Sequence, residues 1–331
     1  KLKEKKESAL TVIGPENISL QFHFATAADF GSVLFQTSAS DEFLTAWGTV
    51  DAAATEEIIF EEKGINILPS CLREDYTTDP VPELIQASSV KGIIHSHSNW
   101  SDGGSTIEAM AKHAQEKGYE YLVISDHSKS AFYANGLSVE RIAEQHKYID
   151  ELNNKMKGFR IFKSIEADIL GDGSLDYDDD VLATFDLVIA SVHSNLKMNE
   201  DKAMMRVMNA IENPYTTILG HMTGRLLLSR NGYPLDHKKI IDACVANSVV
   251  IELNAHPRRL DIDWRWINHA IKKGALISID PDAHELSGYE DIRYGVLAAQ
   301  KGRLTAAQNL SSFSLQEFED YLMEVRREKG I

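Results

Sequence analysis

The 331-residue chain is poor in cysteine and has no long apolar segment. Its two cysteines, Cys71 and Cys244, lie far apart in unrelated contexts, which excludes a disulfide framework and a cysteine-based zinc site. Low cysteine use favours a reducing compartment, so we expect a cytoplasmic protein. No run of about 18 apolar residues occurs, and the sequence therefore predicts no membrane-spanning helix.

Basic residues are also scarce. The chain has 34 Lys and Arg against 50 Asp and Glu, a formal net charge of −16, which argues against tight nonspecific binding to phosphate backbones. The deficit is largest in residues 1–90, where 6 basic residues face 15 acidic ones. The first six residues, KLKEKK, lack the apolar segment of a secretory signal. The absence of an initial methionine leaves open whether the chain is a piece of a longer protein.

From about residue 91 onward, one unit recurs seven times: a short apolar run that ends in polar residues able to bind metals. The runs cover residues 91–97, 121–127, 160–168, 187–193, 216–221, 249–256 and 275–284. Continuous apolar runs are typical of strands buried on both faces. The segments 106–118, 234–248 and 264–274 have helical periodicity, so strand and helix alternate as in a parallel α/β fold.

The ends of these runs favour a barrel over an open, doubly wound sheet. In a barrel, the loops after the carboxyl ends of the strands converge on one mouth, whereas an open sheet spreads them along a crevice. Because each run ends in His, Asp or Glu, convergence would place these side chains in one cluster. We therefore expect a (β/α)7 barrel domain over residues 89–331.

Residues 1–88 have a different pattern and predict a small α/β domain. Segments 18–27 and 32–38 are typical of short strands, and 41–54 is typical of a helix. The segment 68–86 contains three prolines and predicts a linker.

Nine side chains at the strand ends of the barrel domain form a candidate metal centre. They are His95, His97, Asp102, His127, Glu166, His193, His221, Asp282 and His284. Imidazole and carboxylate ligands without thiolates suit Mn²⁺, Zn²⁺ or Fe²⁺, and His95 and His97 share a strand face, so they can bind one ion. Nine ligands exceed the needs of one ion, so we expect two or three divalent ions. Structural zinc sites are usually closed and rich in cysteine, so the set indicates catalysis, with metal-assisted phosphoester hydrolysis as the best match.

The order of these residues resembles the polymerase-and-histidinol-phosphatase (PHP) superfamily. The ordered elements H-x-H, Asp102, SDH, EAD, SVH, GH and DAH carry the resemblance, which covers about residues 91–310. The stretches WSDG, SDHSKS, GRLLLSR and RRLDIDWRW look like the PHP domain at the C-terminus of bacterial family X DNA polymerases. The resemblance implies the PHP fold, a distorted seven-stranded (β/α) barrel with a trinuclear metal site, and a manganese-favouring 3′-5′ exonuclease.

The resemblance also implies how the nine residues divide among three ions. The first ion would be held by His95, His97, Glu166 and Asp282. The second would be held by His193 and His221, with Glu166 bridging, and the third by Asp102, His127 and His284.

Residues 1–88 resemble the end of a polymerase palm and thumb in the stretch ADFGSVLFQTSAS. Ala39 stands where the family has a turn glycine, and Gln21 stands where the last catalytic aspartate of the palm is expected. An amide is not an anionic metal ligand, so we expect a remnant without polymerase activity.

Two enzymatic functions and one non-catalytic function compete. The first is a phosphodiesterase that processes DNA 3′ ends by attack of a metal-activated hydroxide, with Lys129, Arg225 and Arg259 clamping phosphate oxygens. Each of these three cations could equally form a structural salt bridge. The second is a phosphomonoesterase acting on histidinol phosphate or a nucleotide, and the third is a scaffold without catalysis. The sequence leaves the oligomeric state and the metal identity open.

Overall fold

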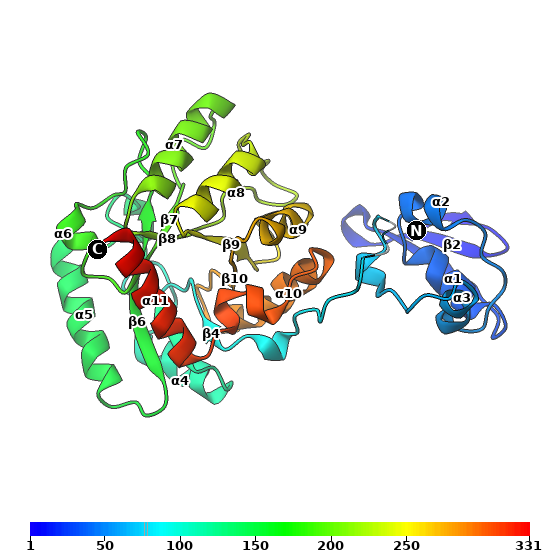
Figure 1. Cartoon of the computed structure of the whole chain (residues 1–331), viewed down its shortest axis with the longest axis horizontal. Helices are drawn as coiled ribbons and strands as arrows, with labels where there is room; N and C mark the ends of the chain where they lie inside the picture. Colours follow the sequence, from blue (N-terminus) through cyan, green and yellow to red (C-terminus); the bar gives the residue numbers. More distant parts are fainter. Residues whose placement is uncertain (76, 78) are drawn as a thin grey trace. The chain divides into compact units, whose positions relative to one another are not determined.

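The structure, a computed structural model, describes residues 1–75, 77 and 79–331. The chain divides into two units, Lys1–Val81 and Pro82–Ile331, both drawn in Figure 1. Residues 82–88 pack with the second unit, since the N–H of Ile85 donates to the carbonyl of Leu304 at 2.9 Å. Among the described residues, no helix combines the length and the apolar character needed to cross a bilayer.

The first unit combines an antiparallel sheet with short helices. Strands β1 (Leu2–Lys5), β2 (Ala9–Ile13) and β3 (Ser19–His23) pair in the order β1-β2-β3, and α1 (Phe30–Thr37), α2 (Asp41–Trp47) and α3 (Glu56–Glu62) follow. Aromatic rings from the three helices pack together, with the Phe35 centroid 4.9 Å from that of Trp47 and 5.5 Å from that of Phe60. This aromatic cluster is the core of the unit.

Two predictions for the first unit are wrong in detail. Most of the segment 32–38, predicted as a strand, belongs to helix α1. Its residues Ser32 and Phe35 are buried about one helical turn apart. A short apolar run does not distinguish this helical spacing from a strand. The helix predicted over 41–54 ends at Trp47, because Gly48 has a φ of 91° and cannot continue a right-handed helix.

The second unit contains the seven parallel strands that the sequence predicts. They are β4 (Gly92–Ile93), β5 (Tyr121–Ile124), β6 (Arg160–Asp168), β7 (Leu187–Ser191), β8 (Thr216–Leu219), β9 (Val250–Asn254) and β10 (Ile277–Asp280). Their spatial order is β10-β9-β8-β7-β6-β5-β4, and every neighbouring pair is parallel. Beyond the carboxyl ends of β4 and β10, the N–H of His97 donates to the carbonyl of Ala283 at 2.8 Å. The sheet is therefore a nearly closed barrel.

Helices alternate with these strands and surround the barrel (Figure 1). They are α4 (Ile107–Glu116), α5 (Val139–Asn153), α6 (Asp179–Leu182), α7 (Glu200–Glu212), α8 (His237–Ala246), α9 (Trp264–Lys272), α10 (Ile292–Lys301) and α11 (Leu315–Lys329). Short 3₁₀ helices are η1 (Pro15–Asn17), η2 (Ser70–Leu72), η3 (Ala87–Ser89), η4 (Phe132–Ala134), η5 (Leu286–Asp291), η6 (Ala306–Gln308) and η7 (Leu310–Ser312). The predicted helices 106–118, 234–248 and 264–274 are confirmed as α4, α8 and α9, slightly shortened at their ends.

The C-terminal helix α11 covers the amino-terminal end of the barrel. Phe318 stacks on Tyr121, the first residue of β5, at 4.5 Å between ring centroids. Lys329 donates to the carbonyl of Thr216, the first residue of β8, at 2.6 Å. The side chains that fill the barrel interior, including Val123 and Ile189, form one apolar cluster with Phe318 and other residues of α11. The interior is thus a packed core, and the carboxyl end of the barrel is free to carry a site.

Candidate metal centre

All nine predicted ligand residues come together at the carboxyl end of the barrel. Their nitrogen and oxygen atoms form four overlapping groups, and the atoms of each group lie within 4.8 Å of one another. The groups are His97, Asp102, His127 and His284; His95, His97 and Asp282; His95, Glu166 and His221; and His127, Glu166 and His193. Strands β4 to β8 and β10, or the loops that follow them, supply these residues, so the convergence expected of a closed barrel is present.

Glu166, on the inner face of β6, is the centre of the cluster. Its carboxylate is 1% exposed, and imidazole nitrogens from four other strand ends surround it. The distances to its oxygens are 2.9 Å from His221 Nε2, 3.0 Å from His127 Nδ1, 3.1 Å from His193 Nε2, 3.2 Å from His95 Nε2 and 3.6 Å from His97 Nε2. This position can bridge more than one cation.

Two further carboxylates flank Glu166. Asp282 Oδ1 lies 3.1 Å from His97 Nε2 and 3.5 Å from His95 Nε2. Asp102 Oδ1 lies 3.6 Å from His127 Nε2 and 3.5 Å from His284 Nε2. The cluster thus has a buried part around Asp282 and a more open part around Asp102.

The backbone around the H-x-H motif is shaped for this geometry. His95 and Asp282 both have positive φ, 58° and 51°, a conformation that non-glycine residues adopt at a cost and that is common at functional sites. Gly103 packs against the backbone of the same loop, where an added Cβ would lie 2.1 Å from the carbonyl oxygen of His97. Only glycine fits there, which accounts for the glycine of the WSDG stretch.

Asp126, the middle residue of the SDH stretch, holds the same loop from the neighbouring strand. Its buried carboxylate accepts from the N–H of Ser98 at 2.7 Å, from the Ser98 hydroxyl at 2.6 Å and from Gln145 Nε2 at 2.6 Å. It therefore positions the loop that carries His97 and Asp102. Asp126 was not among the predicted site residues, although a carboxylate directly before His127 is a signal in the sequence.

Outer carboxylates orient several of the imidazoles. The Glu252 carboxylate contacts Nδ1 of His95 and also accepts from the backbone N–H of His221. Asp168 Oδ1 lies 3.0 Å from Nδ1 of His193. Such partners fix the ring so that Nε2 faces the centre, as they do around metal-binding histidines. Glu252 and Asp168 were not among the predicted site residues. The available signals were a carboxylate inside the apolar run 249–256 for Glu252 and a second carboxylate two residues after Glu166 for Asp168.

The protonation of the cluster reflects its dense charge. Burial lowers the pKa of His193, but the carboxylates of Glu166 and Asp168 outweigh it and raise the pKa to about 10. Burial likewise lowers the pKa of His95, yet the charges of Glu252 and Glu166 hold it well above its usual value. Burial raises the pKa of Glu166, and the surrounding imidazoles bring it well below its usual range. Without bound cations, His95 and His193 therefore carry protons that offset part of the carboxylate charge. Burial and the neighbouring His127 instead hold the pKa of His97 well below its usual value.

The donor atoms fit divalent metal ions. Nε2 of His95, Nε2 of His193 and Oε2 of Glu166 are buried and have no well-aligned hydrogen-bond partner among the described residues. Buried polar atoms without partners are rare and call for an explanation such as a bound ion. Imidazole and carboxylate ligands suit Mn²⁺, Zn²⁺ and Fe²⁺. The ligand types of the cluster and its buried atoms without hydrogen-bond partners therefore both fit bound divalent ions.

The three predicted phosphate-binding cations have different positions. Arg259 reaches the cluster, with Nε 3.3 Å from Asp282 Oδ2. Arg225 pairs with Asp263 at 2.7 Å and donates to the carbonyls of Arg259 and Leu260, so it holds the loop that carries Arg259. Lys129 Nζ lies 5.0 Å from the centre of the Tyr177 ring. The substrate-binding role of all three stays a prediction.

Arg206, on helix α7, is a second arginine that holds loops of the site. It is fully buried and donates to the carbonyls of Ile169 and Leu170, after β6, and of Ser194, after β7. It thereby ties together the loops next to Asp168 and His193. No feature of the sequence distinguished it from other helical arginines.

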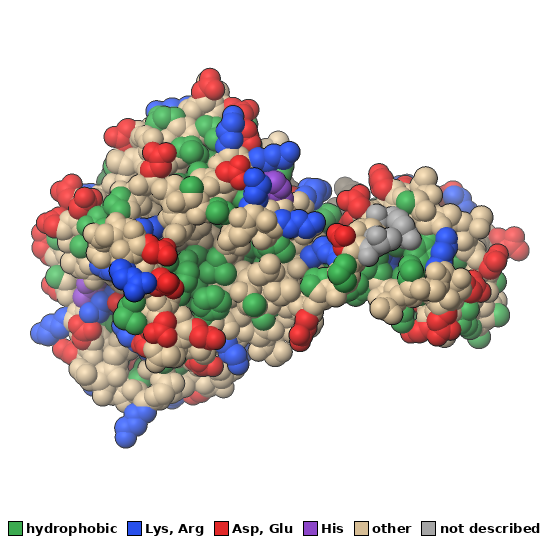
Figure 2. Space-filling model, viewed as in Figure 1, with side chains coloured by type: hydrophobic (Ala, Val, Ile, Leu, Met, Phe, Trp, Pro, Cys, Tyr) green, Lys and Arg blue, Asp and Glu red, His purple; other side chains and the backbone are tan. Residues whose placement is uncertain are grey.

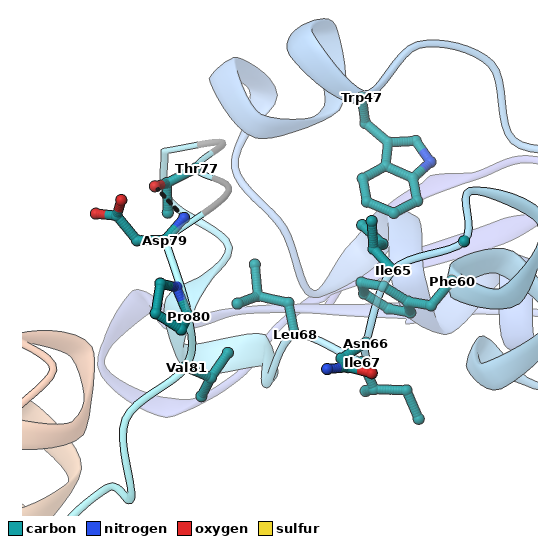
Figure 3. Close-up of a pocket in the computed structure, with 11 residues that line it drawn as sticks. Trp47, Phe60, Ile65, Asn66, Ile67, Leu68, Thr77, Asp79, Pro80 and Val81 are labelled. Carbon is teal, nitrogen blue, oxygen red and sulfur yellow. Dashed lines mark hydrogen bonds between the residues drawn. The ribbon is translucent and has the colours of Figure 1, made fainter.

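Another hollow lies in the first unit, apart from the nine-residue cluster. It has a volume of about 510 Å³ and is lined mainly by apolar side chains, among them Trp47, Phe60, Ile65 and Leu68 (Figure 3). Among the described residues that line it, Asp79 is acidic and none is histidine or cysteine. This composition does not match a metal site.

The matching family model is described as a PHP domain, and it covers residues 94–256. This chain carries a PHP domain. The resemblance seen in the sequence is therefore confirmed for residues 94–256. Seven of the nine cluster residues lie within this match, and Asp282 and His284 follow it in the chain.

Two curated relatives extend this finding. The "DNA polymerase/3'-5' exonuclease PolX" of Bacillus subtilis (strain 168) is 39% identical over 279 residues, which are 83% of this chain and 49% of that protein. A "Probable phosphatase" of Thermoanaerobacter sp. (strain X514) is 28% identical over 178 residues, 50% of this chain and 65% of the relative. The chain thus spans about half the length of the first relative and slightly less than two thirds of the second. The resemblance of residues 1–88 to a polymerase palm and thumb stays a prediction.

Among solved structures, the PHP domain is similar to the histidinol phosphate phosphatase (HISK) of Lactococcus lactis subsp. lactis Il1403, which was solved in complex with zinc, L-histidinol and phosphate. The TM-score is 0.49 at 17% identity, and the match covers 64% of this chain and 94% of that structure.

Proposed function

We propose that this chain is a metal-dependent phosphoesterase that hydrolyses phosphodiester bonds at DNA 3′ ends. The convergence of six histidines and three carboxylates around Glu166 carries the proposal. A 3′-5′ exonuclease among the relatives supports the choice of DNA. The proposed cofactors are two or three ions of Mn²⁺, Zn²⁺ or Fe²⁺.

Bound ions of this kind lower the pKa of a coordinated water and stabilise the attacking and leaving oxygens of a phosphoryl transfer. In the division that the family resemblance implies, the first ion would be held by His95, His97, Glu166 and Asp282, the second by His193 and His221 with Glu166, and the third by Asp102, His127 and His284. The four groups seen in the structure contain the same nine residues. Glu252 and Asp168 orient two of the imidazoles. Arg259, held by the loop that Arg225 fixes, would contact a phosphate oxygen beside Asp282.

A phosphomonoesterase acting on histidinol phosphate or a nucleotide is the second candidate. The net charge of −16 favours it, because extended contact with a polyanion gains little from such a chain. On the face drawn in Figure 2, both acidic and basic side chains occur over the second unit. The relatives described as probable phosphatases agree with this alternative. In either case no polymerase activity is proposed, because Gln21 replaces the expected aspartate.

An assay of purified, Mn²⁺-loaded protein distinguishes the phosphodiesterase from the phosphomonoesterase. It would be given single-stranded DNA labelled at its 5′ end and, separately, histidinol phosphate and nucleoside monophosphates. Stepwise shortening of the DNA that is lost in His97→Ala supports the diesterase. Turnover of a monoester with intact DNA contradicts it and supports the second candidate, and inactivity on both substrates contradicts both.

A further inference from the structure

Two exposed aromatic side chains lie in the loop that follows the cluster residue His127. Phe132 is 86% exposed and Tyr133 is 73% exposed, and both belong to η4 in the loop that follows β5 and His127. Most of each side chain therefore has no packing partner within the fold. An adjacent pair of exposed aromatic rings beside a reactive site is typical of a ligand-binding surface.

Tyr133 faces the cluster. Its ring centroid lies 6.4 Å from that of His127. Partial burial, followed by the charges of Asp168, Glu166 and Asp102, raises the pKa of its phenol to about 12, while Arg259 opposes this shift. The ring thus lies within electrostatic reach of both the carboxylates of the centre and the proposed phosphate-binding arginine.

The loop that presents the two rings is held firmly. The N–H of Ser130 donates to Asp176 at 2.6 Å, and Asn135 Nδ2 donates to the carbonyl of Trp100 at 3.1 Å. The N–H of Gly136 donates to the carbonyl of Ala131 at 3.1 Å. These bonds hold the loop on both sides of η4, so little conformational freedom is lost when a ligand stacks on the rings.

The scarcity of basic residues makes this surface important. Single-stranded nucleic acid is usually bound by a basic groove together with aromatic rings on which the bases stack. Here the chain has a net charge of −16, so attraction to the phosphates supplies less of the affinity than usual. Stacking on exposed rings is the other general source of affinity, and it tolerates any base.

We propose that Phe132 and Tyr133 stack on the terminal bases of single-stranded DNA while Arg259 and the divalent ions that the cluster around Glu166 would bind hold the adjoining phosphate. This inference rests on the proposed function and deepens it, because it makes base-bearing phosphate esters the substrate class. Removal of either ring raises KM by about fivefold or more, the effect of one lost base–aromatic contact, and leaves kcat nearly unchanged. This increase in KM is absent when the terminal bases themselves are removed from the DNA.

The test compares wild type, Phe132→Ala, Tyr133→Ala and Tyr133→Phe, all Mn²⁺-loaded. The substrates are a 5′-labelled single strand and the same strand with abasic sites at its last two positions. Tyr133→Phe keeps the ring and retains the wild-type KM. Met323→Ala is the matched control: Met323 is 62% exposed on α11, at the opposite end of the barrel.

A second measurement does not depend on cleavage. A strand carrying 2-aminopurine at its 3′ end loses fluorescence when the base stacks on wild-type protein, and the alanine variants abolish this quenching. If wild type leaves DNA intact, the proposed function fails, and the quenching still decides the stacking. Equal KM or equal quenching in wild type and the alanine variants overturns the inference, as does an equal effect on abasic DNA. Such a result would favour a protein partner for the aromatic pair.

Discussion

Glu252→Gln is expected to weaken metal binding although Glu252 touches no proposed ion. The side chain is fully buried, and its two oxygens have separate tasks: one contacts Nδ1 of His95 and the other accepts from the N–H of His221. A glutamine has the same shape but offers only one acceptor oxygen. If that oxygen stays with His221, the amide N–H₂ faces Nδ1 of His95. His95 must then carry its proton on Nε2, which can no longer bind an ion.

Turning the amide over does not rescue the site, because its N–H₂ would then face the N–H of His221 and leave two buried donors opposed. Loss of an outer carboxylate of this kind typically costs about tenfold to a hundredfold in metal affinity, or roughly 1.4 to 2.7 kcal/mol. Titration of Mn²⁺ against a competing chelator measures the affinity, and elemental analysis measures the number of ions bound. Glu324→Gln, an exposed change on α11, is the control. An affinity within twofold of wild type in a folded Glu252→Gln protein would refute the reasoning.

Three further predictions follow from the same geometry. Gly103→Ala places a Cβ against the carbonyl of His97, and the free energy of unfolding, measured with urea, should fall by about 1–3 kcal/mol; an unchanged value contradicts the close approach. Arg225→Met leaves the carbonyls of Arg259 and Leu260 without this donor and removes one of the two arginines that pair with Asp263, so kcat/KM should fall about tenfold, whereas Arg225→Lys should restore part of it; equal activity in all three proteins would show that the loop needs no such anchor. Finally, the pKa of His193 is about 10 in the folded, metal-free protein and about 6.5 in an unfolded chain. Its contribution to stability is complete below about pH 6.5 and is lost as the pH rises toward 10, so the urea midpoint of metal-free protein should fall over this window while Mn²⁺ binding tightens. A midpoint that rises with pH would contradict this assignment.

The barrel and its cluster were predictable because they depend on regular features of the chain. The run LVIAS of β7, buried along its whole length, is recognisable from composition alone. The carboxyl ends of parallel strands in a barrel must meet, so His95 and His221 could be placed together without coordinates.

Other features depend on packing that no local pattern records. The segment 32–38 is mostly helical because α1 packs against residues 53–54, where Ser32 Oγ accepts from the N–H of Ala53 at 2.6 Å. Arg225 could not be distinguished from a substrate-binding arginine, since its partners Asp263 and the carbonyl of Arg259 come from another loop. The role of Glu252 depends on the orientation of the His95 ring, because Glu252 contacts its Nδ1.

The position of helix α11 has a consequence for how a polymer would be processed. Because α11 and the packed interior close the amino-terminal end, the described residues of the barrel leave its carboxyl end as the side from which a substrate can enter. Under the proposed function, the released nucleotide and the shortened strand must both leave by the mouth through which the substrate entered. We therefore expect distributive shortening, in which the strand leaves the site between successive cuts. Excess unlabelled DNA added after the first cleavage should then halt further shortening of the labelled strand.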